Sequence, residues 1–206
     1  MNKNLSLLFL IFISISSYAQ NSKSDFLVTK ENDTIFCKVV GLKGKQIEFI
    51  QNGENKSKKK NIFNFLDLKI ADLSVIENPL NLQIEKPENG YAHVYLYRPY
   101  VYTGSALACK VEYNGEKLVN LKTYSYYLHK IKAGEIHKYN WNNSKKDILE
   151  IDAVNGEIYF IRGSFGASFE PWNTISTVRN GMNIFLDNPN TSKYAILTMK
   201  EVSPNY

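Results

Sequence analysis

Residues 91–98 are Tyr-Ala-His-Val-Tyr-Leu-Tyr-Arg, and they give the strongest indication of fold class in this chain. Val94 and Leu96 alternate with Tyr95 and Tyr97, which is the period of two that a β-strand requires. A strand with one face in water carries polar residues on that face, but both faces here are apolar or aromatic. We therefore expect one of two arrangements. Either both faces are covered, with the first region of the chain as a candidate cover, or Tyr95 and Tyr97 form an exposed aromatic strip.

Segments of similar character flank this strand on both sides. They are rich in Thr, Ile, Val, Tyr and Phe, which suit a pleated surface. Asn-Gly pairs occur five times, and several separate these segments, because both residues tolerate the positive φ of a type I′ hairpin turn. No segment holds a helical period over three turns. We expect strands at residues 25–29, 34–42, 46–50, 91–98, 106–113, 117–121, 124–131, 136–141, 147–154, 157–162, 173–178 and 194–199. Residues 61–70 form either a strand or a strand plus a turn, and residues 181–189 form either a short helix or a loop.

The spacing of these segments, about 8–12 residues in the second half, is typical of a sandwich or barrel. The predicted fold class is all-β: a small antiparallel β meander followed by an antiparallel β-sandwich of Ig-like or prealbumin-like type. Weak patterning with two prolines marks a boundary between them. The predicted division is a signal peptide at residues 1–19, a small β domain at 20–73, a linker or edge element at 74–90, and a β-sandwich domain at 91–206.

The beginning of the chain has the three parts of a secretory signal peptide. Lys3 gives a positive start, residues 5–15 are an apolar run, and small residues before Gln20 favour cleavage between Ala19 and Gln20. A membrane anchor is the alternative, but a spanning helix needs about 20 apolar residues and this run is shorter. We expect an exported protein, periplasmic or extracellular, with a peripheral place at the outer membrane left open.

Charge and cysteine content limit the kinds of partner and membrane attachment that we expect. The first cysteine is Cys37, far beyond the apolar run, so we expect no lipoprotein anchor. No later stretch reaches about 18 consecutive apolar residues, so no transmembrane segment is expected in the mature chain. Cleavage changes the net charge from +5 to +4, because it removes Lys3 and no acid. This small net charge argues against nucleic acid as a partner. The basic run at residues 55–60 is expected to be a solvated edge strand.

No catalytic, metal or cofactor site is predicted. Residues 166–170 resemble the nucleophile-elbow pattern G-x-S-x-G, but Glu replaces the second Gly and Pro171 follows where a helix is needed. His93, His129 and His137 have no recognised metal-ligand spacing, so we expect ordinary strand histidines. The second and third of these histidines would become neighbours if their strands paired.

The two cysteines are predicted to be free. Cys37 and Cys109 each alternate with apolar residues, so both side chains are expected to point inward as small hydrophobes. An oxidising envelope permits a disulfide, yet the two lie in different predicted regions, and a disulfide needs Cα atoms within about 7 Å. We therefore expect none, and two cysteines in 206 residues also exclude a disulfide-scaffold protein.

Motifs of the second half occur in an order that resembles one family. Val94-Tyr95-Leu96-Tyr97-Arg98-Pro99 is followed by residues 111–118 with their Asn-Gly pair, by Tyr126-Tyr127, by Ala133-Gly134 and His137, and by residues 156–160. Together they resemble the domain of unknown function family 2846, a family of bacterial exported proteins, over about residues 91–178. The resemblance implies a β-sandwich-like fold and brings no established activity and no catalytic residues. Residues 33–49 resemble small β modules that precede other domains in exported bacterial proteins.

Aromatic side chains form the candidate binding surface. Stiff, amphipathic Tyr and Trp serve as anchors in interfaces, and an exposed apolar patch marks a partner or ligand site. The alternative is that these side chains pack in the core with their hydroxyl groups at the rim. The candidate residues are Tyr95, Tyr97, Tyr124, Tyr126 and Trp141.

These patterns predict a non-catalytic exported envelope protein that binds or scaffolds an unknown envelope protein or glycan. One alternative is an envelope-glycan hydrolase or another secreted enzyme. A hydrolase would need two carboxyl groups about 5–5.5 Å or 6.5–9.5 Å apart, and the candidates are Glu112, Glu135, Asp152, Glu157 and Glu170. A second alternative is a structural subunit of an envelope assembly.

Overall fold

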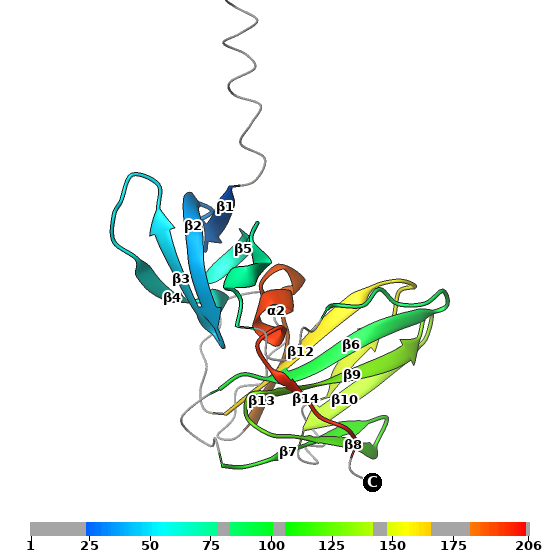
Figure 1. Cartoon of the computed structure of the whole chain (residues 1–206). Coiled ribbons are helices and arrows are strands. Elements are labelled where there is room, and N and C mark those ends of the chain that lie inside the picture. Colours follow the sequence, from blue (N-terminus) through cyan, green and yellow to red (C-terminus); the bar gives the residue numbers. More distant parts are fainter. Residues whose placement is uncertain (1–23, 78–82, 101–105, 142–147, 166–181, 205–206) are drawn as a thin grey trace, which may run out of the picture.

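The structure is a computed structural model and describes residues 24–77, 83–100, 106–141, 148–165 and 182–204 (Figure 1). These residues form three β-sheets and one α-helix, so the chain is all-β as predicted. The predicted signal peptide with its cleavage site at Ala19 and Gln20, the motif at 166–170 and the predicted strand at 173–178 lie outside the described residues. The Ig-like or prealbumin-like type of the sandwich stays a prediction.

The first sheet is a curved antiparallel sheet with the strand order β4-β3-β2-β1-β5. Of the two arrangements predicted for residues 61–70, the structure has the strand plus a turn. Asn61 caps a short 3-10 turn by accepting a hydrogen bond from the Phe63 backbone N–H, and β5 then returns beside β1. The lysine-rich run contributes the exposed edge strand β4, as expected. The elements are β1 (Asp25–Thr29), β2 (Thr34–Lys43), β3 (Gln46–Gln51), β4 (Lys58–Asn61), η1 (Ile62–Asn64), β5 (Phe65–Lys69) and η2 (Leu73–Val75).

Two further sheets stack as a sandwich. The front sheet has the order β11-β10-β7-β8 and the back sheet the order β13-β12-β6-β9-β14. Pairing is antiparallel except between β6 and β12 and between β9 and β14, which are parallel. The strands are β6 (Tyr91–Arg98), β7 (Cys109–Tyr113), β8 (Glu116–Leu121), β9 (Ser125–Lys132), β10 (Ile136–Trp141), β11 (Leu149–Asp152), β12 (Ile158–Phe165), β13 (Met182–Leu186) and β14 (Lys200–Glu201).

Strand β6 is buried on both faces. Val94 and Leu96 belong to the core between the front and back sheets. Tyr95 and Tyr97 belong to a second core, which the back sheet shares with the first sheet and with the helix α2 (Pro189–Ile196). Figure 1 shows α2 between the first sheet and the sandwich. Of the two arrangements that the alternation allows, the covered one is therefore the correct one.

The helix α2 replaces part of a predicted strand. Residues 194–199 were expected to be extended, but Tyr194 lies in the helix. The Asn188 side chain accepts a hydrogen bond from the Asn190 backbone N–H, and Pro189 occupies the first turn, which is the usual start of a helix. Residues 181–189 were expected to form a short helix or a loop. Most of them instead form the strand β13, which pairs with β12.

Of the Asn-Gly pairs that the structure describes, one has the geometry of a type I′ turn. Asn114 and Gly115 both have positive φ, 50° and 91°, and they join β7 to β8. At Gly53, Gly90 and Gly156 the glycine alone has a positive φ. These turns therefore need the conformational freedom of glycine at one position only. The preceding Asn can instead bond through its side chain, as Asn155 does when it accepts a hydrogen bond from the Gly90 backbone N–H.

Direct contacts join the first sheet to the second half of the chain. The Tyr194 hydroxyl accepts a hydrogen bond from the Ile70 backbone N–H, and the Asn188 side chain donates to the Leu66 carbonyl at 2.6 Å. A Cβ added to Gly44 would lie 3.2 Å from the Tyr124 ring, so the β2–β3 turn packs closely against it. The predicted domain boundaries stay a prediction, but the two predicted domains share one hydrophobic core.

Candidate functional site

The aromatic side chains of the predicted binding surface are mostly buried. Tyr95, Tyr97 and Tyr126 are at most 1% exposed, and they pack together beneath α2 and the first sheet. The Tyr95 ring stacks on Phe160 with centroids 5.4 Å apart. The prediction of an exposed strip is therefore wrong, because a period of two shows which residues share a face and does not show what covers that face.

The other two residues of the predicted strip are also internal contacts. Trp141 is 3% exposed and points into the sandwich core, where its ring lies against the backbone of Gly163; a Cβ there would be 3.1 Å from the ring. Tyr124 is partly buried against Gly44. Four of the five residues are therefore buried, and Tyr124 is the one that keeps some exposed surface.

Two of the three histidines join an aromatic cluster between the front and back sheets, in which His137 is buried and His129 is half-buried. The Tyr113 ring contacts both, with centroids 4.5 Å from His129 and 5.7 Å from His137. His137 donates from Nε2 to the Lys132 carbonyl and accepts from the Tyr113 hydroxyl at Nδ1. Their strands lie in different sheets and do not pair, so the two residues become close across the core and not as neighbours on adjacent strands.

This cluster has the chemistry of a packed interior. The Tyr139 hydroxyl lies 2.9 Å from Nδ1 of His129, and burial lowers the pKa of His129 to about 4, with nearby His137 as the second cause. A neutral, hydrogen-bonded imidazole of this kind is a structural side chain. No group of three or more potential metal ligands gathers in the described part of the chain.

Both cysteines point inward, as their alternation predicts. Cys37 is 4% exposed in the first sheet and Cys109 is fully buried in the front sheet, and both are free. Burial raises the pKa of each thiol to about 11. A buried thiol with a raised pKa is a poor nucleophile at neutral pH.

A buried polar cluster fixes α2 in its place. The Tyr97 hydroxyl donates to the Asp187 carboxylate and lies 3.0 Å from the Ser192 hydroxyl. Arg162 Nε lies 2.8 Å from the same carboxylate, and its guanidinium group covers the Phe63 ring at 4.4 Å. Burial and the Asp187 charge hold the pKa of Tyr97 well above its usual value. Ser192 and Tyr97 have no exposed surface, so no substrate reaches this group and its role is structural.

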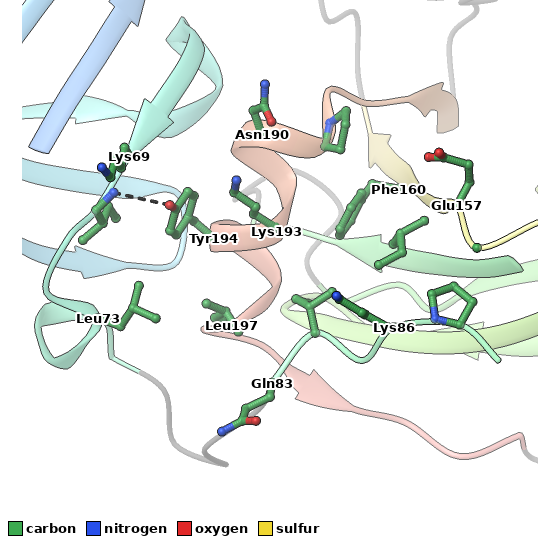
Figure 2. A pocket seen from close by; sticks show the side chains of 16 residues that line it. Lys69, Leu73, Gln83, Lys86, Glu157, Phe160, Asn190, Lys193, Tyr194 and Leu197 are labelled. Atoms are coloured by element: carbon green, nitrogen blue, oxygen red, sulfur yellow. Dashed lines mark hydrogen bonds between the residues drawn. The ribbon is translucent and has the colours of Figure 1, made fainter. Parts of the chain in front are cut away.

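The candidate functional site is a cavity beside this cluster. It has a volume of about 1060 Å³ and opens between the first sheet, α2, residues 83–87 and the start of β12. Figure 2 shows Leu73 on the side of the first sheet, Tyr194 on α2 with Leu197 just after its end, and Phe160 on β12. Ligand pockets are typically about 300–1,000 Å³ and mostly apolar, so this cavity is large enough to take a small organic molecule.

The floor of the cavity is firmly held. Phe160 is 2% exposed and stacks on Tyr95, and Tyr194 is anchored by its hydrogen bond from the Ile70 backbone N–H, drawn as a dashed line in Figure 2. The Tyr95 hydroxyl in turn accepts a hydrogen bond from the Glu85 backbone N–H, which attaches the segment at residues 83–87 to the back sheet. The apolar wall is therefore formed before any ligand arrives.

The rim of the cavity is basic. Lys69, Lys86 and Lys193 line it together with one carboxylate among the described lining residues, that of Glu157. Three lysines and one glutamate give a formal charge of +2. The Lys193 ammonium lies 5.1 Å from the centre of the Tyr194 ring, so a cation–π contact holds it at the cavity wall.

The sequence did not point to this site, and no local signal in it would have. Its residues come from four separate stretches: the end of the first sheet, residues 83–87, residues 156–160 and α2. Of the predicted carboxylate candidates only Glu157 lies here, whereas Glu112 borders a smaller cavity on the front sheet and Glu170 is outside the described residues.

No helix in the described ranges is long and apolar enough to cross a membrane. Comparison with protein-family models finds no match, and neither curated proteins nor solved structures contain a match to this chain.

Proposed function

We propose that this chain is a non-catalytic exported envelope protein that binds a small organic ligand in the cavity between the first sheet, α2 and β12. The observation that carries this proposal is an apolar cavity of about 1060 Å³ with a rigid aromatic floor and a basic rim. A preformed apolar pocket with a few charged groups is the usual form of a ligand site.

A binding role is better supported than hydrolysis. A glycosidase needs two carboxyl groups facing one cavity, and Glu157 is the single carboxylate among the described residues that line this one. Two other buried titratable groups are occupied by internal contacts: the Asp187 carboxylate binds Tyr97 and Arg162, and His137 is bonded at both ring nitrogens.

Export is the part of the proposal that rests on sequence alone. The positive start, apolar run and small residues before Gln20 support a cleaved signal peptide. The order of motifs in the second half supports a relation to the exported family 2846, which carries no activity with it. A periplasmic or extracellular binding protein is consistent with both.

The uncharged fluorophore N-phenyl-1-naphthylamine tests the cavity independently of charge. Its fluorescence should rise saturably with the purified chain, because it exchanges water for an apolar wall. Leu73→Glu should weaken this binding, since Leu73 lines the cavity and is 56% exposed. Leu107→Glu is the matched control, because Leu107 is also 56% exposed but lies outside the cavity.

Two results would contradict the proposal. One is the absence of any saturable fluorescence increase with the folded chain. The other is an equal effect of the Leu73 and Leu107 variants, which would show that the fluorophore binds elsewhere. Circular dichroism of both variants would confirm that they remain folded.

A further inference from the structure

We infer that the ligand of this cavity is a free single-chain amphiphile, a hydrocarbon chain that carries an anionic head group such as a carboxylate. This inference rests on the proposed function, because it requires that the cavity binds a ligand. It is carried by two features of the lining: its aliphatic walls and its basic rim.

The walls match a hydrocarbon chain better than a sugar. Ile70, Leu73, Ile84, Ile158 and Leu197 supply aliphatic surface from four separate stretches of the chain. A sugar or nucleotide would need several converging hydrogen-bond groups, since a polar group that is buried without a partner is costly. The side-chain amides at the described wall are those of Gln83 and Asn190, and both residues are exposed at its edge.

The rim favours a negative head group. Lys86 and Lys193 line the cavity, and neither forms an ion pair with a carboxylate of the described residues. The described lining as a whole has a formal charge of +2, with Glu157 as its one acid. An anion beside these lysines gains from their field, and a cation is repelled.

Lys193 holds its charge at a defined place. It is partly buried on α2, and its ammonium group lies over the ring of Tyr194, 5.1 Å from the centroid. The Tyr194 hydroxyl is itself bonded to the Ile70 backbone. The ammonium group is therefore held beside an aromatic ring of the lining, where it can attract an acid head group whose chain occupies the cavity.

The experiment is displacement of N-phenyl-1-naphthylamine by ligands with one chain length and different heads: dodecanoate, dodecanol and dodecyltrimethylammonium, each below its micelle concentration. Dodecanoate should displace the fluorophore at the lowest concentration. Octanoate and decanoate should be weaker, by up to roughly fourfold for each methylene removed.

Lysine variants test the role of the rim. The double variant Lys86→Gln with Lys193→Gln should bind dodecanoate on the order of tenfold more weakly, since each exposed ion pair contributes a few-fold to the affinity. The fluorophore should still bind, because it is uncharged. Lys56→Gln with Lys122→Gln is the matched control, since it removes the same charge from exposed lysines outside the cavity and should leave dodecanoate binding unchanged.

The outcomes separate the two proposals. If the fluorophore does not bind, the cavity is not a ligand site and both proposals fail. A second outcome is that the fluorophore binds while dodecanoate, dodecanol and dodecyltrimethylammonium displace it equally well, or while the two double variants bind dodecanoate equally well. In either case the cavity is a ligand site, and the inference that its ligand is an anionic amphiphile is wrong. If the chain binds vesicles of anionic phosphatidylglycerol but not monomeric dodecanoate, the ligand is a membrane surface and the free amphiphile is wrong.

Discussion

Acid should destabilise this protein through His129. Its ring lies between the two sheets of the sandwich, against Tyr113, Tyr127 and Tyr139, and burial lowers its pKa from 6.5 to about 4. The unfolded chain therefore takes up a proton near pH 6.5, whereas the folded chain resists protonation down to about pH 4. The stability is fully present above the unfolded pKa and is lost as the pH falls through this window.

The size of the effect follows from the shift. One pKa unit corresponds to about 1.36 kcal/mol, so a shift from 6.5 to about 4 corresponds to at most about 3 kcal/mol. Integrated between about pH 7.5 and about pH 5, the loss in the free energy of unfolding is about 2 kcal/mol. His93 has a pKa lowered by burial as well, so it adds a loss of the same sign.

Urea unfolding at several pH values in this interval measures the loss. His129→Gln is the informative variant, because an amide can still bond to the Tyr139 hydroxyl but does not titrate in this range. The variant should lose about 2 kcal/mol less than the native chain between about pH 7.5 and about pH 5. If the two chains lose equal stability, the imidazole of His129 is not the group that resists protonation and the reasoning from burial is wrong.

Three other perturbations test the packing. Gly44→Ala should destabilise by about 1–2 kcal/mol more than Gly53→Ala in urea unfolding, because the cost of positive φ is common to both and only at Gly44 does the added methyl overpack the Tyr124 ring; equal losses would contradict this contact. Cys37 and Cys109 should react slowly with a thiol reagent at about pH 8 and quickly in urea, since burial raises both pKa values to about 11; rapid labelling of the folded chain would refute their burial. Proteolytic cleavage within residues 83–90 should leave both parts associated in size-exclusion chromatography, because they share one core, whereas separation of a stable second fragment would contradict this and support the predicted two-domain division.

The strands of the sandwich were largely predictable because their signal is local. The alternation of Val94 and Leu96 with Tyr95 and Tyr97 fixed both the strand and its two faces. The same local pattern could not show that the tyrosines are covered, because the cover is a sheet formed earlier in the chain and a helix formed at its end. Tertiary context of this kind routinely overrides sequence patterns.

The helix and the cavity escaped prediction for different reasons. The helix had a usable signal in Asn188 and Pro189, a capping residue followed by a first-turn proline, but apolar residues after it also suit a strand. The cavity had none, because Lys86 and Lys193 are ordinary surface lysines in the sequence and meet only when distant segments are packed together. Sites built from several short stretches carry no spacing that a motif could describe.

The position of α2 in the chain determines when the structure can be completed. The hydrogen bond from Ile70 to Tyr194 joins residues 124 positions apart, and β14 pairs with β9 only through residues 200 and 201. Contacts between such distant residues are slow to form, because a long loop must close before they contribute. A chain emerging from a ribosome or a translocation pore would therefore hold its first sheet without the helix that covers it until residues 189–196 have been released. A chain truncated before Pro189 should keep the core between the front and back sheets, which contains no residue of α2, while the core that the first sheet shares with α2 stays open to any factor that binds incompletely folded chains.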